Sequence, residues 1–196
     1  MTLSAELPAL SLFCFTDVAR DNFADKYEQL LSTARLADAL NFHAIWTPER
    51  HFHTFGGMFA NPSVISAALA ACTQRIGIRA GSVVLPLHDP LRVAEEWAIV
   101  DNLSHGRVGV AFASGWQRND FVLRAENYRQ RQEVLFTSLA QIQALWRGES
   151  VPPHDLSLPP QPQPLTLQTC PPPFHSQIPL YPSTHGTRPL LFLARS

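Results

Sequence analysis

Residues 76–113 decide the fold, because they have the pattern of a strand, a helix and a second strand: IGIRAGSVVL (76–85), LRVAEEWAIVDNL (91–103) and RVGVAFA (107–113). The first and last runs are short and apolar, as buried strands are, whereas the middle run repeats apolar residues at helical spacing. Asp89 followed by Pro90 is the order of a helix N-cap and first helical residue, and Gly106 ends the helix. This unit predicts two parallel strands joined by a helix.

The same alternation extends to both sides of this unit. The predicted elements are a strand at 10–15, a helix at 27–40, a strand at 43–46, a helix opened by Asn61-Pro62, and a helix at 134–146 followed by Gly148. The chain up to residue 150 is therefore predicted to hold four successive strand–helix units. Such alternation predicts an α/β fold with a parallel sheet, either doubly wound or a (β/α)₈ barrel.

The composition limits the classes of partner. The chain has 196 residues, 15 basic and 16 acidic side chains, and a net charge of −1, so no basic excess favours nucleic acid or a membrane surface. No run approaches the roughly 20 apolar residues of a membrane span, and residues 1–12 lack the Lys or Arg of a secretory signal.

Cys14, Cys72 and Cys170 match neither a zinc motif nor a disulfide framework. We therefore expect a cytoplasmic protein with reduced thiols.

The composition changes near residue 150. Residues 151–196 hold 12 of the 17 prolines and three charged side chains. Each proline removes a backbone donor and restricts the preceding residue, so this segment should form neither a helix nor a central strand. We expect one domain at 1–150 and a proline-rich, disordered tail at 151–196. Alternatively, Pro159, Pro162 and Pro164 form a ligand for a proline-recognition domain.

In both candidate folds the chemistry lies beyond the carboxyl ends of the strands. The corresponding loops are Thr16-Asp17, Thr47–Gly57, Pro86–Asp89 and Ser114–Phe121. None of them is a glycine-rich dinucleotide or phosphate loop, which argues against a nicotinamide enzyme or a nucleotide hydrolase. Aromatic, histidine and small residues dominate instead. They predict a site for a flat, mostly apolar ring system with a few polar anchors.

Three blocks of sequence at these loops carry a family resemblance: WTPERHFHTFGG (46–57) with NPSV (61–64), the stretch 75–109, and FASGWQRNDF (112–121). Over residues 9–148 the chain resembles the bacterial-luciferase-like flavin-dependent monooxygenases, and within them the branch associated with natural-product biosynthesis. The resemblance implies a (β/α)₈ barrel that uses reduced FMN, supplied by a separate flavin reductase, and O₂ to oxygenate a small organic substrate. Some relatives use a deazaflavin instead.

The resemblance also implies catalytic residues. Light-emitting luciferases carry two adjacent histidines after a glutamate, whereas this chain has Glu49, Arg50 and His51. Arg50 therefore occupies the position of the catalytic first histidine, and His51 is expected to act as a hydrogen-bond donor or general acid/base near the flavin. The alternative is that Glu49 and Arg50 pair with each other or with a neighbouring helix, while His51 only packs.

Cofactor-binding residues follow from the same resemblance. Gly81-Ser82 occupies the position of a non-proline cis peptide against the flavin ring, although an ordinary glycine at a bulge is equally compatible with the sequence. Ser114 stands where luciferases have a phosphate-binding arginine, and Ser114 with the amide of Gly115 could bond flavin oxygens or phosphate. Arg131 matches a second phosphate-binding arginine, or it is a solvated helix residue.

A metal site is a minor alternative. Glu49, His51, His53 and His88 could form a cluster for a metal-dependent barrel hydrolase, but their spacing is common and we expect no metal.

The length conflicts with a complete barrel, which needs eight strands and about 250 residues. The sequence therefore predicts a truncated barrel of about four strand–helix units with open sheet edges. A change of reading frame in the gene is one explanation, and a second copy that completes the sheet, giving a homo-oligomer, is another. A non-catalytic flavin-binding fragment is accordingly the second functional hypothesis.

Overall fold

The computed structural model describes residues 9–16, 23–151 and 167–181. Its strands and helices alternate in the predicted order. They are β1 (Ser11–Phe13), α1 (Phe23–Ala39), β2 (Ala44–Thr47), α2 (Pro62–Cys72), β3 (Gly77–Val84), α3 (Pro90–Leu103), β4 (Val108–Ala113) and α4 (Arg131–Trp146).

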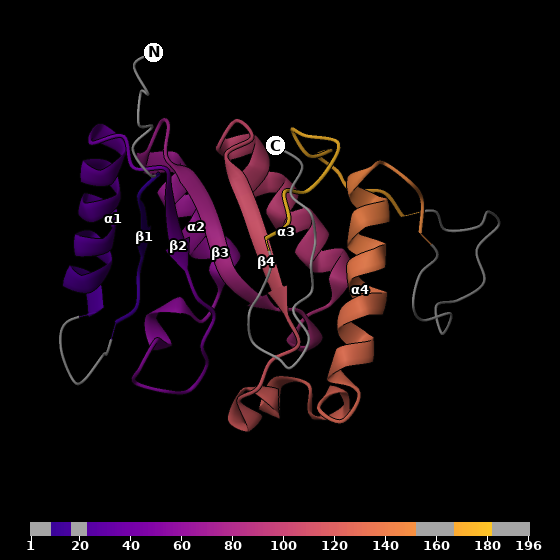
Figure 1. Cartoon of the computed structure of the whole chain (residues 1–196). Coiled ribbons are helices and arrows are strands. Elements are labelled where there is room, and N and C mark those ends of the chain that lie inside the picture. Colours follow the sequence, from indigo (N-terminus) through magenta and orange to yellow (C-terminus); the bar gives the residue numbers. More distant parts are fainter. Residues whose placement is uncertain (1–8, 17–22, 152–166, 182–196) are drawn as a thin grey trace, which may run out of the picture.

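The four strands form one parallel sheet in chain order, β1-β2-β3-β4. Figure 1 shows α2 and α3 behind this sheet, with α1 and α4 to either side. Because each crossover moves the chain on by one strand in the same direction, the helices collect on one face of the sheet, as in a barrel. A doubly wound sheet would reverse direction and carry helices on both faces. The structure thus favours the barrel type of the two predicted folds.

The hydrophobic core lies between the sheet and the helices. Its largest fully buried side chains come from both layers: Trp97, Trp146, Phe59, Ile45, Leu69, Ile76, Ile78, Leu85, Ile142, Val100, Val108 and Val110. The edge strand β1 was predicted to be buried, and this is wrong for Ser11 and Phe13, which are exposed. Leu12 packs on the core, but the side chains on the opposite face of β1 have less cover.

Helix starts follow the predicted capping signals. The side chain of Asn61 accepts a hydrogen bond from the backbone N–H of Val64, and Asp89 accepts from Leu91 and Arg92. In both helices proline is the first helical residue, where its missing N–H costs nothing. Both predicted N-caps are confirmed.

Two buried polar contacts hold the amino-terminal end of the sheet. The carboxylate of Asp38 accepts the backbone N–H groups of Gln74, Arg75 and Ile76 at 2.7–2.9 Å, which joins α1 to the segment before β3. The guanidinium of Arg107 donates to the hydroxyl of Thr73 and to the carbonyl of Ile76. These contacts fix one end of the strands, so the site at the other end has a rigid support.

Residues 167–181 pack against the strand–helix units, and residues 179–181 reach the sheet, which differs from the disorder expected of the proline-rich tail. The backbone N–H of Val110 donates to the carbonyl of Pro179 at 2.9 Å, and the N–H of Tyr181 donates to the carbonyl of Val110 at 3.1 Å. Leu180 thereby forms a single parallel bridge with β4. Proline does not prevent this pairing, because Pro179 contributes its carbonyl and Tyr181 supplies the donor. Pro159, Pro162 and Pro164 lie outside the described residues, and the domain boundary near residue 150 stays a prediction.

The remaining expectations concern membranes and thiols. Among the helices in the described part of the chain, none has the length and apolarity to cross a membrane. Cys14, Cys72 and Cys170 are all free, as predicted.

Candidate functional site

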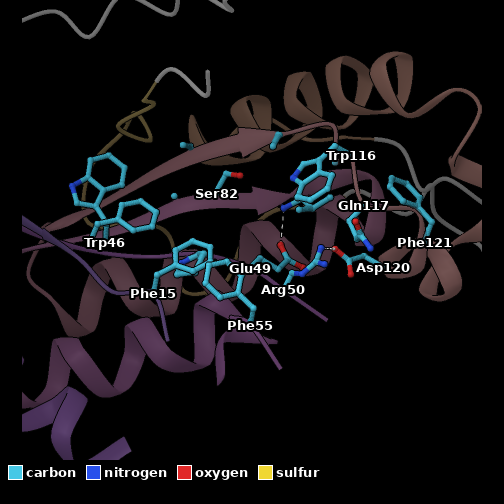
Figure 2. Close-up of a pocket in the computed structure, with 17 residues that line it drawn as sticks. Phe15, Trp46, Glu49, Arg50, Phe55, Ser82, Trp116, Gln117, Asp120 and Phe121 are labelled. Atoms are coloured by element: carbon cyan, nitrogen blue, oxygen red, sulfur yellow. Dashed lines mark hydrogen bonds and ion pairs between the residues drawn. The ribbon is translucent and has the colours of Figure 1, made fainter. Parts of the chain in front are cut away.

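A cavity of ≈ 450 Å³ lies at the carboxyl ends of the strands, where the loops were predicted to carry the chemistry. This volume falls in the range of ordinary small-molecule sites, about 300–1,000 Å³. Figure 2 shows aromatic rings on several sides of it. The aromatic lining residues are Phe13, Phe15, Trp46, Phe55, Trp116 and Phe121. These walls suit a flat, apolar ring system.

The β3 wall of the cavity depends on a glycine. The Gly81-Ser82 peptide bond is cis, as the resemblance implied, and a register irregularity follows between Gly81 and Val83. A Cβ atom on Gly81 would lie 2.9 Å from the ring of Trp46 and 3.2 Å from the ring of Phe13. Since real Cβ atoms essentially never lie within 3.0 Å of another heavy atom, any larger residue at position 81 would force the Trp46 ring or the strand to shift.

Arg50 and Asp120 form an ion pair at the cavity. Nη1 of Arg50 donates to Oδ2 of Asp120 at 3.1 Å, and the guanidinium carbon lies 5.4 Å from the centre of the Trp116 ring. Both residues of the pair line the cavity. Burial raises the pKa of Asp120 above its usual range, although Arg50 and His51 act in the opposite direction. Asp120 belongs to the loop quoted in the resemblance, but nothing in the sequence distinguished it from its neighbours.

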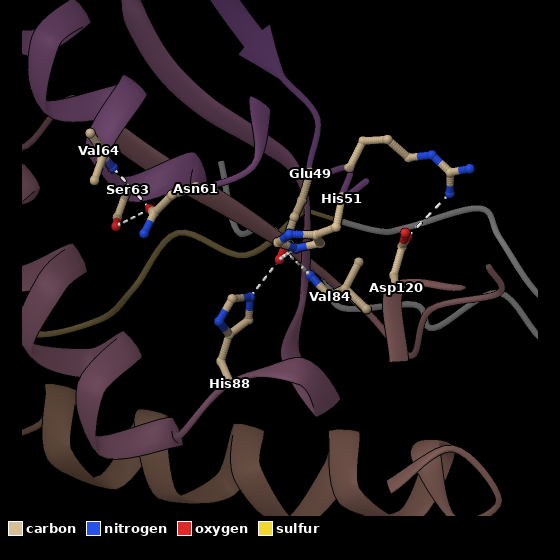
Figure 3. Close-up of polar contacts among 9 residues, drawn as sticks. Glu49, His51, Asn61, Ser63, Val64, Val84, His88 and Asp120 are labelled. Carbon is tan, nitrogen blue, oxygen red and sulfur yellow. Dashed lines mark hydrogen bonds and ion pairs between the residues drawn. The ribbon is translucent and has the colours of Figure 1, made fainter. Parts of the chain in front are cut away.

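Glu49 is the centre of a buried hydrogen-bond cluster (Figure 3). Its carboxylate accepts Nε2–H of His51 at 2.7 Å, Nε2–H of His88 at 2.5 Å, and the backbone N–H of Val84 at 2.6 Å. Burial alone would raise the pKa of Glu49, but these donors outweigh burial and hold the pKa below its usual range. Burial likewise lowers the pKa of His88, and the contact with Glu49 raises it above the ordinary value overall.

The predicted catalytic residues therefore separate into two groups. Arg50 and Glu49 line the cavity, whereas His51 is buried against Glu49 and is absent from the described residues that line it. Glu49 and Arg50 do not pair with each other, since each has its own partner. A role of His51 next to the flavin stays a prediction.

The proposed metal cluster is smaller than the sequence allowed. Ligand atoms of Glu49, His51 and His88 lie within 4.8 Å of one another. His53 is not in this group, and its Nδ1 instead accepts the backbone N–H of Phe55 at 3.1 Å. The two histidines meet at Oε1 of Glu49, so a metal ion bound there would have to displace the protons that they share with this carboxylate.

Of the predicted phosphate-binding residues, Gly115 is among the described residues that line the cavity, whereas Ser114 and Arg131 are not. Nε of Arg131 donates to the carbonyl of Gly115 at 3.2 Å, and Nη1 donates to the carbonyl of Tyr128 at 2.9 Å. Arg131 is therefore tied to the loop after β4, and the interpretation of a solvated helix residue does not fit. Gly115 lines the cavity, while Ser114 is half-buried beside it and is not among the described lining residues.

Comparison with known sequences identifies relatives of this chain. The sequence model described as luciferase-like monooxygenase matches residues 9–194. The oxygenase component of a flavin-dependent trigonelline monooxygenase from Acinetobacter baylyi is 31% identical over 146 residues, which cover 71% of this chain and 39% of that protein. An alkanal monooxygenase alpha chain from Photorhabdus luminescens is 32% identical over 92 residues, which cover 47% of this chain and 25% of that protein.

Solved structures show the same fold. The monooxygenase RslO1 from Streptomyces bottropensis matches with a TM-score of 0.74 and 26% identity, covering 88% of this chain and 52% of that one. The FMN complex of the oxygenating constituent of 3,6-diketocamphane monooxygenase from Pseudomonas putida matches with a TM-score of 0.73 and 16% identity, covering 87% and 50%. This chain thus spans about half the length of these structures and 39% of the trigonelline relative.

Proposed function

The chain belongs to the luciferase-like monooxygenase family, and from that premise we propose that its cavity binds the ring of reduced FMN for the O₂-dependent oxygenation of a small organic substrate. The observation that carries this proposal is the aromatic-lined cavity at the carboxyl ends of the strands, with the Gly81-Ser82 peptide in its β3 wall. The separate reductase is proposed because a relative is named as an oxygenase component.

The residues at the cavity fit such a cofactor. A planar tricyclic ring would pack against the aromatic side chains of Phe15, Trp46 and Phe55, which line the cavity. Gly81 and Ser82 would lie against the ring. Reduced flavin supplies two electrons to O₂, so that one oxygen atom enters the substrate and the other leaves as water.

The polar residues have distinct proposed roles. Gly115, Ser114 and Arg131 are the candidates for the phosphate end, because Arg131 is bound to the loop that carries the other two. Arg50 would orient a polar atom of the ring or substrate. Glu49 holds the backbone on both sides of the cavity, and His51 would exchange protons with it through their 2.7 Å hydrogen bond.

Two alternatives remain within this proposal. A deazaflavin has the same tricyclic shape and could occupy the same cavity. The chain could also bind flavin without turnover, as the sequence-based hypothesis of a non-catalytic fragment has it. A metal-dependent hydrolase stays a minor alternative, because Glu49, His51 and His88 lie together while His53, the fourth residue considered, does not join them.

An anaerobic titration tests the proposal. FMNH₂ and a reduced deazaflavin are added separately to the purified chain, and each complex is then mixed with O₂, a reductase and a panel of small organic substrates. We expect FMNH₂ to bind and Phe55→Leu to weaken its binding more than Phe52→Leu, because Phe55 lines the cavity and Phe52 does not. Binding without oxygenated product favours the non-catalytic alternative, and no saturable binding of either cofactor contradicts the proposal.

A further inference from the structure

Asp120 and Arg50 offer complementary polar groups to whatever occupies the cavity. We propose that this ion pair recognises a neutral ring edge on which an N–H or O–H donor stands beside a carbonyl. The inference rests on the proposed function in one respect, namely that a planar ring occupies the cavity.

Asp120 supplies the acceptor. Its side chain is only 6% exposed, and Oδ2 is occupied by Arg50, but Oδ1 is buried without a hydrogen-bond partner among the described residues. A buried carboxylate oxygen without a partner is costly, because it has lost its hydration and gained no donor in return. Since Asp120 lines the cavity, a ligand in the cavity can provide the missing donor.

Arg50 supplies the donors. Its side chain is 12% exposed, and the hydrogen bond to Asp120 uses Nη1 alone. The stacking contact with Trp116 holds the guanidinium plane near the cavity. With respect to the described residues, the remaining guanidinium N–H groups are thus available for a carbonyl oxygen next to the donor that Asp120 accepts.

The charges of the pair define the ligand class. The two side chains neutralise each other, so an anion would be repelled by Asp120 and a cation by Arg50. The backbone N–H of His51 also lies near Asp120 but does not reach hydrogen-bond geometry at Oδ1, and the nearby carboxylate of Glu49 already accepts three donors. The fitting chemistry is the pyrimidine edge of a flavin or the lactam edge of an organic substrate. A simple aldehyde, which has an acceptor and no donor, would leave Oδ1 unpartnered.

Two pairs of probes distinguish these sources. Lumiflavin is compared with 3-methyllumiflavin, in which a methyl group replaces the ring N–H, by quenching of flavin fluorescence. Isoquinolin-1(2H)-one is compared with its N-methyl derivative by calorimetry, with the chain both free and saturated with FMN. We expect the N–H member of one pair to bind about tenfold or more tightly than its methyl derivative. The pair that shows the preference identifies the flavin or the organic substrate as the ligand.

The variant Asp120→Asn tests the assignment to this residue. The side-chain oxygen of the asparagine would accept from Arg50, so its NH₂ group would take the place of Oδ1. An NH₂ group cannot accept a hydrogen bond from the N–H of the ligand. We expect the preference for the N–H probe to disappear. Phe55→Leu is the matched control, because it alters the cavity without a polar atom and should weaken both members of a pair equally. If Asp120→Asn does not fold, as judged by circular dichroism, Arg50→Lys provides the second variant. It should weaken binding of both members of a pair while leaving the N–H preference.

Equal affinity for both members of each pair would overturn the inference, and so would a preference that survives in Asp120→Asn. These results are distinguishable from failure of the proposed function. If FMN binds but each N–H probe binds no more tightly than its methyl derivative, only the inference fails. If no flavin binds, the proposed function fails, and the isoquinolinone pair on the flavin-free chain still decides the role of Asp120.

Discussion

Nε2 of His88 lies 2.5 Å from Oε1 of Glu49, and this contact joins the loops that follow β3 and β2. Glu49 immediately precedes Arg50, while Val84, which also donates to Glu49, is the last residue of β3. The cluster therefore fixes the backbone on both sides of the cavity. Its contribution to stability and to the position of Arg50 can be measured separately.

The contact between His88 and Glu49 predicts a pH dependence of stability. The pKa of His88 is raised, so its contribution is complete below the unfolded value of 6.5 and is lost as pH rises through the folded pKa. The pKa of Glu49 is lowered, so its contribution is present above the unfolded value of 4.5 and is lost as pH falls through the folded pKa. Glu96 also raises the pKa of His88, and Arg124 lowers it.

We therefore expect the difference in unfolding free energy between wild type and His88→Gln to be largest between pH 4.5 and 6.5. It should shrink as pH rises through the folded pKa of His88, because His88 is then neutral in both states. Urea denaturation across this pH range provides the measurement. A difference that is constant with pH would contradict the charged contact.

Glu49→Gln should destabilise the fold. The glutamine has one acceptor oxygen and an NH₂ group where the carboxylate accepts three donors, so at least one buried donor loses its partner. We expect the free energy of unfolding to fall by about 2–3 kcal/mol. Glu126→Gln is the control, because Glu126 makes an exposed ion pair with Arg124 and should cost less than about 1 kcal/mol. Equal, small losses in both variants would show that the cluster does not stabilise the structure.

Gly81→Ala should disrupt the cavity wall. The added Cβ would meet the Trp46 ring at 2.9 Å, and that ring packs edge-on against Tyr181. We expect a loss of about 1–3 kcal/mol of stability and weaker FMN binding. In Gly77→Ala on the same strand, the close atoms are the end of the Arg79 side chain, which hydrogen-bonds the carbonyls of Ile78 and Arg107 and is not among the described residues that line the cavity, so FMN binding should weaken less. Unfolding curves and FMN titrations of both variants make the comparison, and the opposite order would contradict this description of the β3 wall.

Tyr181→Ala tests whether residues 178–181 pack as described. The Tyr181 ring lies edge-on to the Trp46 ring, with 5.1 Å between the two ring centres. The guanidinium carbon of Arg79 lies 5.1 Å from the centre of the Tyr181 ring. We expect a loss of about 1–2 kcal/mol and a changed Trp46 fluorescence environment. Phe174→Ala is the control in the same segment, since Phe174 is 55% exposed. Unchanged stability and emission in Tyr181→Ala would favour the disordered tail expected from composition.

Local signals in the sequence predicted much of the fold. The strand–helix alternation and the caps at Asn61 and Asp89 depend on neighbouring residues, and the structure has them in the predicted places. The pairing of Val110 with residues 179–181 could not be predicted, because it depends on contacts between segments far apart in the chain. Proline content alone suggested that no such pairing would occur.

The candidate site was predicted in its location but not in all of its contacts. The loops after the strands were identified, and Arg50 lines the cavity as expected. The orientation of His51 depends on Glu49, which in turn is fixed by Val84 and His88 more than 30 positions away. Asp120 was missed for the same reason, since its partner Arg50 is distant in sequence.

Amide chemical-shift mapping during a titration with FMN tests the central claim most directly. The isotope-labelled chain is titrated, and shift changes are followed residue by residue. The account predicts saturable changes concentrated at Arg50, Gly81, Ser82 and Gly115, around the aromatic-lined cavity. Changes confined to the outer helices α1–α4, or no saturable change, would contradict the claim that this cavity binds flavin.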